Sequence, residues 1–302
     1  MTYFVTLLGA ILIFTALRDI FHELFHPSGS GSVNGAVTRF VWRVFRRLAR
    51  YFPSALGLAG PVALITVITA WTILLVTGWA LIYLPHLPDK FLFATELDPR
   101  AQSGFIDALY LSFVTLATLG FGDITPTSDW LRILVPLEAL LGFALLTASI
   151  TWVLSLYPAL TRQGTLAHET RLLYEAQKET GISLGDLNES ATAQTLNRLT
   201  RQLILVHSDL TQFSIVYYFH ERSERTSLPA NVSYLTNLAG QGDKSNSAGA
   251  RLEAAMLRKA LEDFAKTLAK NFLVVSLDST EDILAAYAQN HLQESDSPGA
   301  KA

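Results

Sequence analysis

The chain has 302 residues, of which 50% are hydrophobic and 16% are charged, and its formal net charge is −3. Soluble domains carry about 25% charged residues, so this chain is short of charge. A near-neutral balance argues against nucleic acid as the main partner. The sequence contains no cysteine, which excludes disulfides and thiolate metal sites. Residues 53–88 lack Lys, Arg, Asp and Glu, whereas charges recur every few residues from Arg162 onward. This pattern predicts a membrane part followed by a soluble part.

The chain begins with an apolar run, residues 3–17, which lacks the basic residues and small-residue cleavage site of a secretory signal. A membrane helix needs about 20 residues, so the helix must extend toward Phe25 and include several charged residues. Those residues then have to face protein or the membrane interface. We predict an N-terminal membrane helix within residues 1–26 that emerges near Arg18 and is ended by Pro27.

Residues 27–59 are predicted to form a linker and an interfacial helix. The SGSGS sequence at residues 28–32 is typical of a flexible link. Apolar residues then recur at helical spacing, and arginines occupy mostly other faces: Arg39, Arg43, Arg46, Arg47 and Arg50. Such a helix lies in the membrane interface with its arginines toward anionic lipid headgroups. Five arginines without an acid also indicate the cytoplasmic side. An ordinary surface helix is the alternative.

Two further spans flank a shorter apolar segment. Residues 60–84 are uncharged and about 37 Å long as a helix, which is enough to cross a bilayer. Residues 105–117 reach only about 20 Å, so we predict a re-entrant helix rather than a span. Residues 131–157 form the returning span. Irregular backbone at membrane depth must be buried in protein or line a watery cavity, so residues 118–123 must face one of these.

The segment Thr115–Asp123 reads TLATLGFGD. Glycine adopts positive φ without steric cost, so alternate residues here can direct their carbonyls the same way. A row of inward carbonyls can replace the hydration shell of a cation. The segment therefore predicts an ion-selectivity filter, and a glycine-rich turn between membrane helices is the alternative.

This arrangement resembles the pore module of potassium channels, whose filter signature is T-x-x-T-x-G-[YF]-G-[DN]. The stretch DALYLSFVTLATLGFGDITPTSDW is similar to the pore stretch of bacterial two-span potassium channels, and LEALLGFALLT is similar to their inner helix. The resemblance covers about residues 60–157. It implies an ion-channel pore domain at residues 60–160, with outer helix 60–84, pore helix 105–117, filter 118–123 and inner helix 131–157.

The resemblance also implies roles for individual residues. K⁺ is expected at the carbonyls of Thr118, Leu119, Gly120 and Phe121, with the Thr118 hydroxyl, and Gly122 completes the filter. Thr115, Asp123 and Glu138 are expected to support it. Encircling an ion requires four copies, so a homotetramer is expected. Ions move passively, without catalysis or an organic cofactor.

The filter departs from the family pattern at two positions: Leu119 replaces the usual Val or Ile, and Ala117 replaces a frequent second Thr. Phe121 is a known variant of Tyr in the signature but lacks its hydroxyl. These departures leave the strictness of selectivity open. A weakly selective monovalent cation channel is therefore one alternative to a potassium-selective channel, and a non-conducting membrane scaffold is another.

Two residues of the returning span have two interpretations each. Glu138 is a carboxylate inside a membrane helix, which is costly when unpaired. It is either a brace behind the filter or pore helix, or a structural residue near the outer interface. Gly142 is either a gating hinge, as the resemblance favours, or a close-packing site.

The residues His22–His26 spell H-E-x-x-H, the zinc-protease pattern with two histidine ligands and Glu23 as general base. Pro27 ends the helix immediately after His26, and no downstream third ligand is evident. The zinc metalloprotease is therefore a minor alternative. A pH-sensitive interfacial contact of Asp19, His22 and His26 is another interpretation.

Residues 161–302 are predicted to form a helical cytosolic domain that assembles the tetramer or, less commonly, binds a gating ligand. Expected elements are helices near 165–179, 190–221, 248–272 and 282–292, a short strand at 273–277, a loop at 240–247 and a disordered tail from 294, with Asn188 as a helix cap. Strands and helices do not alternate, which argues against a dinucleotide-binding fold. The prediction is an all-α membrane protein that crosses the plasma or inner membrane several times. An arginine-rich voltage-sensing span is absent from the sequence.

Overall fold

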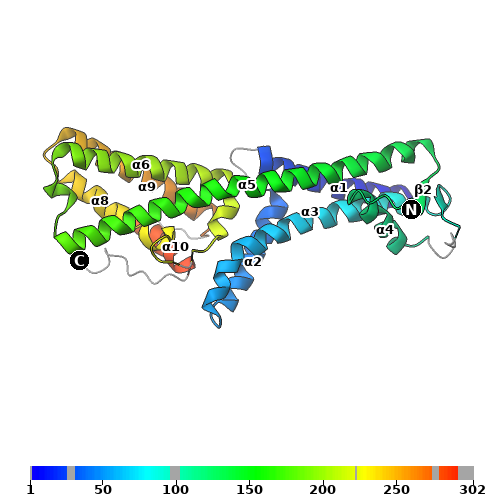
Figure 1. The fold of residues 1–302 in the computed structure, drawn as a ribbon, viewed down its shortest axis with the longest axis horizontal. Helices are drawn as coiled ribbons and strands as arrows, with labels where there is room; N and C mark the ends of the chain where they lie inside the picture. Colours follow the sequence, from blue (N-terminus) through cyan, green and yellow to red (C-terminus); the bar gives the residue numbers. More distant parts are fainter. Residues whose placement is uncertain (1, 26–30, 96–102, 222, 274–278, 292–302) are drawn as a thin grey trace. The chain divides into compact units, whose positions relative to one another are not determined.

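The computed structural model describes residues 2–25, 31–95, 103–221, 223–273 and 279–291 (Figure 1). These residues form helices and one two-stranded ladder, which confirms the all-α class. They group into two compact units, one of Met1–Phe40 with Ala63–Ser155 and the other of Val41–Val62 with Leu156–Ala302. Each unit is described separately.

The first unit contains the apolar helices. Its elements include α1 (Thr2–Phe25), the start of α2 (Ser32–Leu48), most of α3 (Ala59–Tyr83), η2 (Leu84–His86), β1 (Phe91–Phe93), α4 (Phe105–Leu116), β2 (Ile124–Pro126) and the first half of α5 (Asp129–Thr180). Among the described residues, three stretches are long and apolar enough to cross a membrane: Tyr3–Leu24, Ser54–His86 and Asp129–Thr180. These stretches include the three spans predicted from the sequence.

Helix α1 continues past Arg18 to Phe25, which agrees with the helix predicted within residues 1–26. The charged residues Asp19 and Glu23 are 2% and 3% exposed, so they face protein rather than the bilayer. Facing protein is one of the two placements that the sequence requires for these residues in an extended helix. The emergence from the membrane near Arg18 stays a prediction.

Helices α1 and α3 approach each other closely at two glycines. A Cβ atom added to Gly9 would lie 2.4 Å from the carbonyl oxygen of Gly78, and one added to Gly78 would lie 2.9 Å from that of Gly9. Small residues allow membrane helices to bring their backbones together in this way. The N-terminal helix therefore packs directly against α3.

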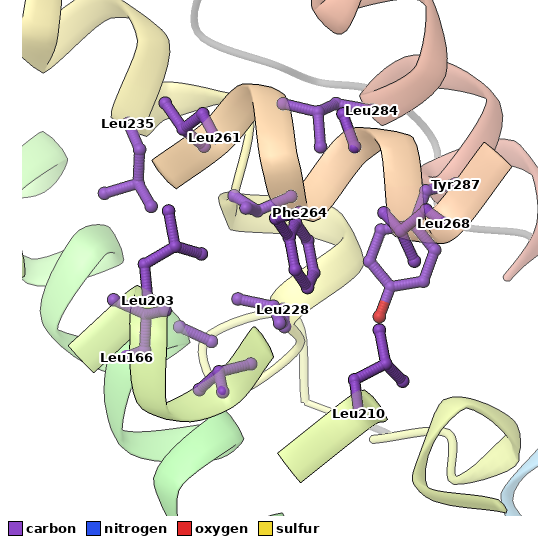
Figure 2. Close-up of a cluster of buried hydrophobic side chains, with 14 of the residues drawn as sticks. Leu166, Leu203, Leu210, Leu228, Leu235, Leu261, Phe264, Leu268, Leu284 and Tyr287 are labelled. Atoms are coloured by element: carbon purple, nitrogen blue, oxygen red, sulfur yellow. The ribbon is translucent and has the colours of Figure 1, made fainter. Parts of the chain in front are cut away.

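The second unit is a helical bundle. It includes η1 (Pro53–Leu58), η3 (Leu184–Asp186), α6 (Glu189–Gln212), η4 (Ser214–Tyr218), α7 (Leu228–Asn231), α8 (Tyr234–Asp243), α9 (Ala248–Asn271) and α10 (Thr280–Asn290). Leucines of α6 and α9 meet Phe264 of α9 and Tyr287 of α10 in its buried core (Figure 2). Apolar faces on α6 and α9 thus form much of this core, whereas Leu252 and Met256 of α9 are 63% and 44% exposed.

Several boundaries in this unit differ from the prediction. Helix α6 ends at Gln212, and the following residues form the separate turn η4. Residues 240–243, expected in a loop, belong to α8. The Asn188 cap is confirmed, since its side chain accepts a hydrogen bond of 2.8 Å from the backbone N–H of Ala191. Most of the predicted strand at 273–277 and the tail from 294 lie outside the described residues.

Candidate functional site

The backbone of the glycine-rich segment alternates in conformation. Thr118, Gly120 and Gly122 have φ values of 58°, 59° and 77°, in the left-handed region. Glycine adopts this region freely. For a β-branched residue such as Thr118 it is an outlier that costs about 1–3 kcal/mol and persists where the surrounding structure enforces it. Such strain clusters at functional sites.

The segment leaves the C-terminal end of α4 through two backbone turns. The N–H of Thr118 donates to the carbonyl oxygen of Thr115 at 2.9 Å, and the N–H of Leu119 donates to that of Val114 at 2.9 Å. The residues that follow are exposed, with Leu119 at 57% and Phe121 at 65%. In one copy of the chain, the candidate filter is therefore an open strip of backbone.

Asp123 is held at the other end of the strip. The Tyr110 hydroxyl on α4 donates to Asp123 Oδ2 at 2.6 Å. The carbonyl oxygen of Asp123 accepts a hydrogen bond of 2.8 Å from the N–H of Ala94. Directly after it, β2 pairs antiparallel with β1, with Phe93 opposite Ile124. The ladder connects the end of the candidate filter to the preceding loop.

Sequence reasoning missed both Tyr110 and the ladder. The Phe121 side chain could have pointed to Tyr110. Because Phe121 lacks a hydroxyl, another residue has to supply a hydroxyl that supports the candidate filter. The three-residue strands carry no periodic signal of their own.

Glu138 joins three helices in the first unit. Its side chain is fully buried, at 0% exposure. Tyr83 of α3 donates its hydroxyl to Oε2 at 2.5 Å, and Ser112 of α4 donates to Oε1 at 2.5 Å. Both carboxylate oxygens therefore have a donor, and a buried polar group needs such partners. The arrangement favours the brace interpretation of Glu138.

Gly142 lies where α5 meets the end of α4. A Cβ atom at this position would lie 1.9 Å from the carbonyl oxygen of Leu116. Close packing therefore requires glycine here, independently of any hinge. A cavity of about 270 Å³ adjoins the contact and is lined by residues that include Thr118, Phe143 and Ser149.

The H-E-x-x-H residues do not form a recognisable metal site in the described part of the chain. His26 lies outside the described residues. Glu23 is buried, and its Oε2 accepts a hydrogen bond of 2.5 Å from Asn34 Nδ2. No group of three His, Asp or Glu residues placed to hold a metal is found among the described residues. A glutamate held in this way is poorly placed to act as a general base.

The arginines of the predicted interfacial helix are all exposed: Arg39, Arg43, Arg46 and Arg47 on α2, and Arg50 in the turn after it. On the same helix, Phe40, Val44 and Leu48 are 60%, 45% and 41% exposed. An exposed apolar row beside exposed arginines is typical of a helix that lies in a membrane interface.

Residues 62–157 match the family model described as "Ion channel". These residues belong to the ion channel family. The matched segment contains most of α3, the helix α4, the strip from Thr118 to Asp123 and α5 as far as Tyr157. The protein is a membrane protein with an ion-channel pore module.

Two relatives extend the comparison. The chain is 24% identical over 236 residues to "Uncharacterized membrane protein YdjJ" of Bacillus subtilis (strain 168), which covers 75% of this chain and 66% of the relative. It is 36% identical over 63 residues to "Two-pore potassium channel 5" of Arabidopsis thaliana, which covers 20% of this chain and 15% of the relative. The matched part thus spans slightly less than two thirds of the first relative. No solved structure matches the chain.

Proposed function

We propose that the protein is a homotetrameric, potassium-selective channel that conducts K⁺ passively through the filter Thr118–Asp123. The observation that carries this proposal is the alternation of left-handed residues at Thr118, Gly120 and Gly122, inside a segment of the ion channel family. This alternation can turn successive carbonyls to the same side, where they replace the water shell of an ion.

Potassium is favoured by the signature residues and by one relative. Two glycines flank an aromatic residue, and Asp123 follows, as in the potassium-channel signature. The Arabidopsis relative is named a potassium channel. We assign ion binding to the carbonyls of Thr118, Leu119, Gly120 and Phe121, with Gly122 completing the strip. Thr115, Asp123 and Glu138 act as supports.

The openness of the filter in one copy supports assembly of several copies, and the resemblance to potassium channels suggests four. The strip is exposed, so a single chain cannot surround an ion. Helix α5 also exposes apolar side chains along its length, among them Leu140, Phe143 and Leu146 at 63%, 64% and 58%. Neighbouring copies and lipid would cover these residues.

The membrane orientation rests on the arginines of α2. Exposed arginines next to a span favour the cytoplasmic side and anionic headgroups. We therefore place α2 on the cytoplasmic face of the cell membrane, and the bundle of the second unit in the cytoplasm.

Ion flux from proteoliposomes tests this proposal. The wild type should release K⁺ down a gradient, whereas Gly120→Ala and Gly122→Ala should abolish release. A Cβ meets no atom within 4 Å at either glycine in one chain, so each substitution acts through its left-handed φ, at about 1–2 kcal/mol per copy. Gly164→Ala, on α5 outside the matched segment, is the matched control and should conduct normally. Flux that survives both filter substitutions would sink the filter assignment.

Reversal potentials under K⁺ on one side and Na⁺ on the other separate the two channel hypotheses. A potential near the K⁺ limit supports strict selectivity. A potential near zero indicates the weakly selective cation channel, for which the departures at Leu119 and Ala117 are the sequence reason.

A further inference from the structure

Two buried carboxylates lie one turn apart at the end of α1. Asp19 and Glu23 are four residues apart, so they share one face of the helix. That face packs against the start of α2 and against α3. Each carboxylate meets a different set of hydrogen-bond partners there, and the difference determines its chemistry.

Asp19 is fully supplied with donors. Its Oδ1 accepts from the N–H of Val33 at 2.8 Å, and its Oδ2 accepts from the N–H of Asn34 at 3.1 Å and from Trp71 Nε1 at 2.8 Å. The two backbone N–H groups belong to the first turn of α2, where they lack acceptors within the helix. The positive end of a helix also stabilises a carboxylate. Both oxygens of Asp19 therefore have hydrogen-bond donors.

Glu23 lacks a donor for one oxygen. Its Oε2 accepts from Asn34 Nδ2 at 2.5 Å. Glu23 Oε1 and Asn34 Oδ1 are both buried and have no hydrogen-bond partner in the described part of the chain. If the oxygen and nitrogen of the Asn34 amide are exchanged, one oxygen of each side chain still lacks a donor. The Glu23–Asn34 pair is therefore short of one hydrogen in either orientation of the amide.

We propose that Glu23 is a proton-binding site, in which the protonated carboxyl group donates to the carboxamide oxygen of Asn34. One hydrogen then satisfies both remaining acceptors and closes a ring of two hydrogen bonds between the side chains. Burial of an ionised carboxylate without a cationic partner is costly, and protonation avoids that cost.

A metal cation fits this site less well than a proton. Ca²⁺ takes six to eight oxygen ligands, and Mg²⁺ needs an octahedral set. The pair offers only two buried oxygens without partners. A proton needs only these two.

The groups around Glu23 come from three elements. Those that bear on its charge are the Asn34 side chain of α2, the backbone N–H of Gly31 and the Asp19 carboxylate of α1. Trp71 of α3 acts through its hydrogen bond to Asp19. Beside Glu23 in sequence, His22 turns its ring to Phe21, with ring centroids 6.4 Å apart. Loss of the proton leaves a negative charge on Glu23, one turn from the Asp19 side chain.

The site is linked to the pore module through two tryptophans. Trp71 donates to Asp19, and its ring lies 5.3 Å from that of Trp152 on α5. Both rings are 1% exposed. The protonation state of Glu23 thus acts on Trp71 through Asp19 and on α5 through Trp152. Any effect of Glu23 protonation on ion conduction rests on the proposed function, whereas the proton site itself does not.

Infrared spectroscopy of the full chain in lipid tests the proton site directly. A protonated carboxylic acid has a C=O stretching band that a carboxylate lacks. We expect a band from buried carboxyl groups that disappears as pH is raised, is absent from Glu23→Gln and remains in Glu138→Gln. The glutamine amide reproduces both hydrogen bonds to Asn34, so this variant should fold as the wild type does.

Tryptophan emission, measured on the same samples, tests the link to α5. It should shift with the same midpoint as the band in wild type and stay constant in Glu23→Gln. A band unchanged by Glu23→Gln, or no titrating band in wild type, overturns the proposal. A band that titrates without any change in emission overturns the link to α5. Neither readout depends on ion flux, so failure here is distinct from failure of the proposed function.

Discussion

The Tyr110 hydroxyl donates a hydrogen bond of 2.6 Å to Asp123 at the end of the proposed filter. Tyr110→Phe removes that donor while keeping the ring. Both groups are partly solvated, so we expect a loss of about 1 kcal/mol, or about fivefold in the balance between conducting and collapsed filters. Single-channel recordings should show a correspondingly larger closed fraction.

Asp123→Asn serves as the companion variant for this prediction. It keeps an acceptor oxygen for Tyr110 and should retain part of the effect of the hydrogen bond. Open fractions in Tyr110→Phe equal to those of the wild type would contradict a supporting role for Tyr110.

Glu138 is the acceptor for two buried hydroxyls, on Tyr83 and Ser112. Glu138→Leu leaves both donors buried without a partner, at about 1–3 kcal/mol each. We expect a lower unfolding temperature and less assembled protein on size-exclusion chromatography.

The triple variant Tyr83→Phe, Ser112→Ala, Glu138→Leu removes donors and acceptor together. Replacement of a whole buried polar set by apolar groups is often close to neutral, so this variant should recover much of the lost stability. If the triple variant is as unstable as Glu138→Leu, the hydrogen bonds are not what Glu138 contributes.

For single residues, the sequence reveals which side chains are costly in their surroundings more readily than it reveals their hydrogen-bond partners. Glu138 was conspicuous as a carboxylate in an apolar span, and the filter glycines by their spacing. Tyr83 and Ser112 were not, because a hydroxyl in a helix carries no signal until the fold brings it to an acceptor. Asn34 likewise became informative only beside Glu23.

At the scale of elements, Gly142 brings α5 against the end of α4. Gly142→Ala would force α5 away from Leu116, since the added carbon would lie 1.9 Å from a carbonyl oxygen. We therefore expect a clear loss of thermal stability and of assembly. A pure hinge role predicts an intact fold with an altered open fraction instead.

Gly164→Ala is the matched control in the same helix, since an added Cβ meets no atom within 4 Å there. Alanine is favoured over glycine in a helix by about 1 kcal/mol, so this variant should be at least as stable as the wild type. Equal stability of the two alanine variants would remove the packing argument for Gly142.

Some long helices were predicted well, but α5 runs unbroken from Asp129 to Thr180 where the sequence predicted two helices. The outer helix expected at 60–84 is α3, Ala59–Tyr83, and the helix expected at 248–272 is α9, Ala248–Asn271. The glycines after Leu238 suggested a loop, but burial of Leu235 and Leu238 carries α8 through to Asp243. Tertiary packing overrides local propensity in such cases.

At the scale of the whole molecule, the change in charge density near Arg162 lies close to Leu156, where the chain enters the second unit again. The second unit also includes Val41–Val62, which no composition boundary marks. Trp42 explains this grouping, since its Nε1 donates to Asn290 at 2.9 Å and its ring lies 6.1 Å from that of Tyr217. Trp42 is far in sequence from Tyr217 and Asn290, and such contacts produce no periodic pattern that could be predicted from the sequence.

The second unit should lose stability in mild acid because of His291. Its side chain is 1% exposed, and neither ring nitrogen has a hydrogen-bond partner in the described part of the chain. Burial, with smaller contributions from His220 and Arg46, lowers the pKa of His291 from 6.5 to about 3. Between these values the unfolded chain binds a proton that the folded chain does not. The contribution of neutral His291 is therefore complete above about pH 6.5 and falls as pH decreases toward 3, by at most about 1.4 kcal/mol per pH unit.

His291→Phe tests this prediction, because it keeps an aromatic ring beside Trp42, Tyr217 and Tyr287 and removes the titration. Thermal unfolding of the full chain in detergent, followed by circular dichroism between pH 7 and pH 4.5, should show a shallower decline for the variant. At pH 7 the variant should be no less stable than the wild type, because it buries no unpaired ring nitrogen. If the thermal stability of the two proteins declines equally with falling pH, groups other than His291 cause the acid sensitivity.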